Sequence, residues 1–207
     1  MNSITPPTFE WLQLAPILTV LLAACVGILI EALLPRRWRY LAQVVLFEVT
    51  VGVAFAFLVL SWRLPADSVG LMAMGSVSLD GPTYLMWGAL LVFGLLSLLV
   101  FSERDLHNGT TAFAASAASV PGSPAEAEAV AAHHEHSEVF PLALFSLSGM
   151  MVFVAANDLL TAFVALEVMS LPLYLLCGMA RKRRLLSQEA ALKYFLLGAL
   201  ASAFFLF

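Results

Sequence analysis

The feature of this sequence that most restricts its fold is a series of long apolar runs separated by short polar breaks. Each run is close to the roughly 20 residues that an α-helix needs to cross a bilayer. Because the runs are continuously apolar and do not alternate, they exclude a closed β-barrel. The sequence therefore predicts an all-α, polytopic transmembrane helical bundle with about six membrane-spanning helices, at residues 12–34, 40–62, 83–101, 139–156, 159–180 and 187–207.

The amino-acid composition excludes a soluble globular domain. Of the 207 residues, 61% are hydrophobic and 12% are charged, whereas about a quarter of the residues of a soluble domain are charged. A chain of this size has too little interior to hide so many apolar side chains, so lipid must solvate them. Both cysteines, Cys25 and Cys177, lie inside apolar runs, which favours packing thiols over a disulfide framework or a thiolate metal site.

The basic residues indicate how the chain is oriented in the membrane. Residues 1–11 contain no Lys or Arg, unlike the start of a signal peptide, so we expect the first span to remain in the mature protein. Cytoplasmic connections are enriched in Lys and Arg. Only Arg63 lies in the predicted connections of one side, and we therefore expect the N-terminus on the outer, periplasmic side. The opposite connections carry Arg36, Arg37, Arg39, Arg104, Arg181, Lys182, Arg183 and Arg184.

Three parts of the chain are predicted. Residues 1–101 hold three N-terminal transmembrane helices, residues 102–138 form a mobile cytoplasmic loop rich in Ala, His and Glu, and residues 139–207 hold three more helices. The loop offers little apolar surface for packing. The last run ends at Phe207 without a polar cap, so we expect the natural polypeptide to continue beyond it.

A cluster of possible metal ligands lies within this loop, at His133, His134, Glu135 and His136. Adjacent histidines beside a flexible tract lack the preformed geometry of a selective metal site. We therefore expect a solvated loop and no metal site.

Four ionisable residues inside the predicted spans are the candidates for chemistry, because each costs at least ~2.5–3.5 kcal/mol at a helix centre. They are Glu31, Glu48, Glu167 and Lys193. Glu31 is close to the end of its span, so we expect it to reach the interface and pair near Arg36. Glu48 lies roughly 12 Å inside the membrane, where it is either a helix–helix hydrogen-bonding residue or a proton site.

Glu167 is the strongest candidate, near the centre of TAFVALEVMSLPLYLL. Desolvation would protonate a lone carboxylate there unless a cation or water stabilised its charge. Pro172 cannot donate to the carbonyl of Val168, which leaves an acceptor for a bound water beside the acid. We interpret Glu167 as a proton-exchanging group, the alternative being a protonated structural residue.

Lys193 lies about two turns inside the last span, in ALKYFLLGALASAFFLF. A buried lysine readily shifts its pKa downward and can release its proton. Small residues follow it, from Gly198 to Ala203, and permit close helix packing. Because the preceding connection is short, we expect Glu167 and Lys193 to share one polar pocket. A structural ion pair is the alternative.

These two stretches carry a resemblance to a known family. ANDLLTAFVALEVMSLPLYLL followed by SQEAALKYFLLGALASAFFLF resembles the antiporter-like membrane subunits of bacterial NADH-quinone oxidoreductase (respiratory complex I), and most closely the subunit N family. The match is dense over residues 137–207, and before them only the helical layout agrees. The resemblance implies a fourteen-helix fold with two inverted five-helix repeats, of which this chain would hold the N-terminal part. It assigns Glu167 and Lys193 to the family's intramembrane glutamate and the lysine that follows it.

The resemblance also implies a function. The chain would be a proton-translocating subunit of an enzyme complex in the bacterial plasma (inner) membrane, assembled with other membrane subunits. NADH, FMN, iron–sulfur clusters and quinone would be bound by other subunits, and no cofactor or nucleic acid by this one. Two alternatives remain open: a subunit of a multi-subunit cation/proton antiporter, and a non-conducting membrane scaffold.

Overall fold

A computed structural model describes residues 11–63, 70–103, 112–113, 120, 123–131, 136–180 and 184–207. Long helices occupy all the predicted spans, and within the described ranges five of them are long and apolar enough to cross a membrane. The sixth, α5, is apolar but has only 17 residues. This confirms the all-α transmembrane bundle and a multi-pass membrane protein. The long helices are α1 (Trp11–Leu33), α2 (Arg36–Trp62), α3 (Gly81–Phe101), α5 (Val139–Ala155), α6 (Leu159–Gly178) and α7 (Arg184–Leu206).

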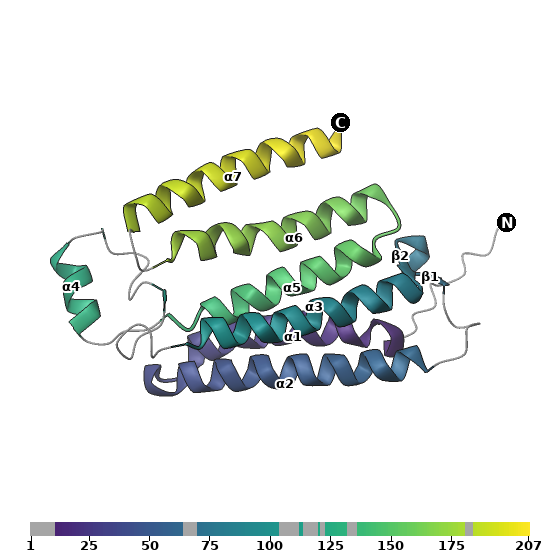
Figure 1. Cartoon of the computed structure of the whole chain (residues 1–207), viewed down its shortest axis with the longest axis horizontal. Helices are drawn as coiled ribbons and strands as arrows, with labels where there is room; N and C mark the ends of the chain where they lie inside the picture. The colour runs from purple at the N-terminus through teal and green to yellow at the C-terminus, as the bar shows by residue number, and fades with distance from the viewer. Residues whose placement is uncertain are drawn as a thin grey trace.

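Helix α5 is the centre of the bundle. It packs against α1, α3 and α6, and Figure 1 shows it between α6 and the first three helices. Leu144 and Met151 on α5 are completely buried. The indole Nε1 of Trp87 on α3 donates to the backbone oxygen of Met151 at 2.8 Å, which satisfies a polar group that would be costly to bury alone. The shortest span therefore organises the others.

Helices α1 and α5 approach closely because of a glycine. A Cβ added at Gly27 would lie 2.8 Å from the Cβ of Pro141, so only glycine permits this contact. The buried backbone oxygen of Gly27 accepts from the Nε2 of Gln43 on α2 at 2.7 Å. One small residue thus brings three helices together.

A small β-hairpin, absent from our predictions, joins α2 to α3. It consists of β1 (Gly70–Met72), the short 3₁₀ turn η2 (Ala73–Gly75) and β2 (Val77–Leu79), paired antiparallel. Residues 73–75 all have positive φ, a conformation that the terminal Gly75 adopts without strain. The turn is held from the α5–α6 connection, where Asn157 donates its backbone N–H to Ser76 at 2.9 Å and its Nδ2 to Gly75 at 2.8 Å.

The same end of the bundle carries two matching helix caps. Asp80 precedes α3 and accepts from the backbone N–H of Thr83 at 2.9 Å. Asp158 precedes α6 and accepts from the backbone N–H of Thr161 at 2.8 Å. The threonine hydroxyls also donate to these carboxylates. These hydrogen bonds lower the pKa of both aspartates, because they favour the charged form.

Part of the 102–138 connection is described. It contains a short helix, α4 (Pro124–Ala131), which the composition did not predict. Phe113 contacts the ring of Phe101 on α3 with 5.4 Å between centroids and pairs with Ala180 beyond α6. His133, His134 and Glu135 lie outside the described residues. The mobility of this connection stays a prediction.

Candidate functional site

Glu167 lies next to a close contact between α5 and α6. A Cβ added at Gly149 on α5 would lie 2.5 Å from the backbone nitrogen of Met169. The Oγ of Ser146 donates to the backbone oxygen of Met169 at 3.0 Å. Helix α6 continues through Pro172. We expected Pro172 to leave the carbonyl of Val168 unpaired, and the Ser146 hydroxyl donates to the next carbonyl, that of Met169. The backbone beside Glu167 is thus held in place by α5.

The surroundings of the Glu167 carboxylate are the second feature of this site. The residue is half-buried, and its side chain makes no hydrogen bond or ion pair with any described residue. Only its backbone oxygen is engaged, by the Oγ of Ser170 at 3.5 Å. An ionisable residue in the middle of a spanning helix is a candidate functional residue, because its insertion into the membrane is costly.

Lys193 has a different partner from the one expected. Its Nζ lies 2.5 Å from the Oε1 of Glu189, one turn earlier on α7. Both side chains are exposed in this chain, at 68% and 55%. This i,i+4 pair orders the ammonium group along the helix surface.

The register between α6 and α7 follows from two ring contacts. Phe163 stacks near Phe205 with 6.4 Å between centroids, and Tyr174 meets Tyr194 edge-on at 4.6 Å. The two helices therefore run antiparallel, so that a residue further along α6 lies level with a residue correspondingly earlier on α7.

This register does not bring Glu167 and Lys193 into one pocket. It places Glu167 level with Ala201, eight residues from Lys193, which is roughly 12 Å along the helix axis. Lys193 also leans toward Glu189, away from Glu167. Helices α6 and α7 are neighbours, as expected. However, Glu167 and Lys193 lie at different levels along the two helices, which separates their side chains.

Glu31 is held as a structural residue. Its Oε1 accepts from the Nε2 of Gln43 at 2.9 Å, and its Oε2 lies 3.6 Å from the Nη1 of Arg39. The expected pairing at the helix end is present, with Arg39 in place of Arg36. Arg39 is one helical turn further along and on the side of α2 that faces α1.

Glu48 is on the exposed face of α2. It makes no hydrogen bond or ion pair with a described residue, so no helix–helix hydrogen bond within this part of the chain accounts for it.

Cys25 and Cys177 are also exposed on this chain and are not joined in a disulfide.

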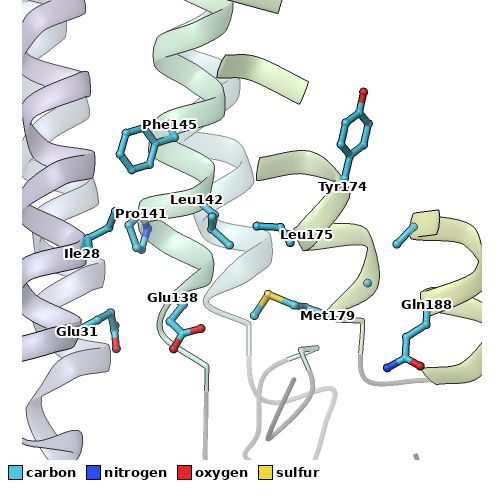
Figure 2. A pocket seen from close by; sticks show the side chains of 12 residues that line it. Ile28, Glu31, Glu138, Pro141, Leu142, Phe145, Tyr174, Leu175, Met179 and Gln188 are labelled. Atoms are coloured by element: carbon cyan, nitrogen blue, oxygen red, sulfur yellow. The ribbon is translucent and has the colours of Figure 1, made fainter. Parts of the chain in front are cut away.

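A cavity of about 570 Å³ opens between α1, α5, α6 and α7. Figure 2 shows Glu31 and Glu138 at the lower left of the view, Gln188 at the lower right beyond Met179, and the Tyr174 ring pointing upward, away from all three. The remaining walls are apolar, with Leu142 and Phe145 among them. Glu31 at this level pairs with Arg39 at the start of α2.

Glu138 and Tyr174 were not singled out from the sequence. The His136 side chain, 3.5 Å from the Glu138 carboxylate, lowers the pKa of Glu138 through a hydrogen bond. The Tyr174 hydroxyl lies directly against Gly198 on α7. The small residues of α7 that begin at Gly198 leave room for the Tyr174 hydroxyl, and this run of small residues was the sequence feature that could have indicated the contact.

Within the described ranges, no three His, Cys, Asp or Glu side chains form a group that could hold a metal.

Comparison with known proteins identifies the family. A family model described as NADH:quinone oxidoreductase/Mrp antiporter, TM, matches residues 156–207. NADH-quinone oxidoreductase subunit N 3 of Streptomyces griseus is 51% identical over 213 residues, which cover 100% of this chain and 38% of that protein. The chain belongs to the subunit N family. Subunit N of Thermobifida fusca is 53% identical over 97% of this chain and 37% of its own length.

A solved structure agrees with this assignment. Respiratory complex I from Thermus thermophilus with bound aureothin contains a chain that matches 92% of this one at 27% identity and a TM-score of 0.65. The match covers 34% of that chain. The chain thus spans 38% and 37% of the two curated relatives, and the similarity extends over α1–α3 as well as over the motif-bearing helices.

Proposed function

We propose that this chain is a proton-translocating membrane component of an NADH-quinone oxidoreductase. The observation that carries the proposal is the Glu167 carboxylate in a spanning helix, which has no partner among the described residues, within a chain about half identical to subunit N along its whole length. NADH oxidation, flavin, iron–sulfur clusters and quinone reduction would belong to other subunits, and this subunit would contribute translocation and no redox chemistry. The basic residue distribution favours a periplasmic N-terminus.

Glu167 is the central proton-exchanging group in this proposal. Lys193, paired with Glu189, would be a separate station nearer the arginine-rich end of the bundle. The Tyr174 hydroxyl lies against Gly198, at a level between the two stations, where it offers both a donor and an acceptor. Water would complete the connections, since roughly 12 Å of helix axis is too far for direct transfer.

Replacing Glu167 by Gln tests the proposal. Gln keeps the size and hydrogen-bonding capacity of Glu but has no titrating proton. We expect the complex to assemble normally while proton pumping and coupled activity fall severalfold in reconstituted vesicles, with Glu31→Gln as the matched control at a partnered acid. Unchanged pumping in E167Q would count decisively against a transport role. Loss of assembly at the same time would favour the scaffold alternative.

The antiporter alternative requires a separate measurement, because the family model includes Mrp antiporters by its description. The relatives that cover the whole chain are named as subunits of NADH-quinone oxidoreductase, which favours the complex I function. Affinity purification of this chain from its native membrane should co-purify NADH:quinone oxidoreductase activity. Recovery with cation/proton exchange and without that activity would establish the alternative.

A further inference from the structure

A second cavity lies away from the proton-exchanging residues, as a groove of about 620 Å³ between α2 and α3. Its floor includes Leu58, Gly88 and Ala89. A Cβ added at Gly88 would lie 3.5 Å from the Cδ2 of Leu58, an ordinary contact distance, so the groove at this point is lined by the glycine backbone beside a buried leucine. The volume is within the ~300–1,000 Å³ typical of ligand pockets.

The groove has the length of one membrane leaflet. It extends along α3 from Tyr84 to Phe93, nine residues or roughly 13 Å. Half of the ~30 Å hydrocarbon core is about 15 Å. A spanning helix of a partner protein would require a contact surface over the full thickness, whereas this groove ends near the middle of the membrane. Its dimensions fit an acyl chain entering from one side.

The mouth of the groove carries the groups expected at a lipid headgroup. The exposed Trp62 lies there, with 6.2 Å between its ring centroid and that of the buried Tyr84, and tryptophan is enriched at membrane interfaces. Arg63 ends α2 at the same level, is exposed, and lines the groove. It is also the only basic residue in the predicted connections of that side. A guanidinium group binds a phosphate through two parallel hydrogen bonds.

We propose that this groove binds a glycerophospholipid from the leaflet at the hairpin end of the bundle. One acyl chain would lie between α2 and α3 above Gly88, and the lipid phosphate would be bound by Arg63. This site is independent of the proposed proton path, so the failure of either proposal leaves the other standing.

Photolabelling of the intact complex in vesicles tests the lipid site. The probe is a phosphatidylglycerol with a diazirine in one acyl chain, compared with a diacylglycerol that carries the same chain and no phosphate. We expect the phosphatidylglycerol to label groove peptides of α2 and α3 more strongly. Arg63→Gln should lower that labelling about fivefold, the effect of one basic side chain near an anionic lipid surface, and leave the diacylglycerol signal unchanged.

Two further variants separate the acyl and phosphate contacts. Gly88→Leu should fill the groove and reduce labelling by both probes, whereas Gly52→Leu, on α2 where nothing lies within 4 Å of an added Cβ, should not. Arg37→Gln, at the opposite end of α2, is the charge control. Equal labelling by the two probes, an unchanged signal in R63Q or in G88L, or a protein helix seated in the groove of the assembled complex would overturn the proposal.

Discussion

Polar side chains have different surroundings in two regions of the molecule. One region is the bundle of α1, α2, α3 and α5, and the other is the helix pair α6–α7. In the bundle, Gln43 and Trp87 are buried and donate to backbone oxygens of neighbouring helices, and Glu31 is held by two partners. In the pair, the Glu167 carboxylate has no described partner, and Lys193 is exposed. These three polar side chains of the first region hold helices together, whereas Glu167 in the second region has no partner among the described residues and is the group to which we assign proton exchange.

The largest effect is expected where the two regions meet, at Gly149. A Cβ there would lie within 3 Å of three backbone atoms of α6, and overpacking of this kind costs roughly 1–3 kcal/mol or more. Gly149→Ala should lower the amount and heat stability of the assembled subunit on native gels. Gly52→Ala is the matched control, because an open helical position gains up to about 1 kcal/mol from the same change. Equal behaviour of the two variants would contradict the close contact.

The next largest effect, on proton pumping, is expected for substitutions of Lys193 on α7. Lys193→Arg should assemble yet pump poorly, because Arg keeps the charge but does not readily release its proton. Lys193→Ala should pump less well still. Since Lys193 and Glu167 are separated along the helices, the free-energy losses of the single variants should add in the double variant to within ~0.5 kcal/mol. Marked non-additivity in vesicle pumping assays would restore the shared pocket.

A smaller effect is expected at the cap of α3 in the bundle. Asp80→Ala should destabilise the folded chain by about 0.5–2 kcal/mol, the usual cost of a lost N-cap. Because hydrogen bonds from Thr83 lower the pKa of Asp80, its contribution is present above about pH 4 and is lost as the pH falls through the folded-state pKa. Asp80→Asn keeps the cap without the titration. Thermal unfolding in detergent from pH 3 to 7 should show a flatter pH dependence for D80N.

The smallest effect is expected for Glu31→Gln. Gln can still accept from Gln43, and only the partly exposed charge pair with Arg39 is lost, which is typically worth ~0–1 kcal/mol. Stability should therefore fall slightly and pumping should match that of the wild type. A pumping defect as large as that of E167Q would remove the distinction between a partnered and an unpartnered intramembrane acid.

The sequence by itself determined the membrane fold and most helix boundaries. Continuous apolar runs leave only helices as spanning elements, and the observed helices begin and end within four residues of the predicted spans. It also made Glu167 the main candidate for function, because an acid among apolar residues at mid-span is costly, and that role stays a prediction. The hairpin at residues 70–79 was missed because its order depends on hydrogen bonds from Asn157, far away in the sequence.

Only the tertiary structure decided which charged residues meet. Sequence spacing made α6 and α7 neighbours, but their register depends on ring packing between Tyr174 and Tyr194, and that register separates Glu167 from Lys193. Likewise, the partner of Glu31 is Arg39 because helix rotation, not sequence distance, determines which arginine faces α1. The hydropathy of a segment depends only on its own residues, so spanning helices can be predicted from the sequence. Contacts between helices depend on how each helix is rotated about its axis and shifted along it, and the apolar pattern does not specify either.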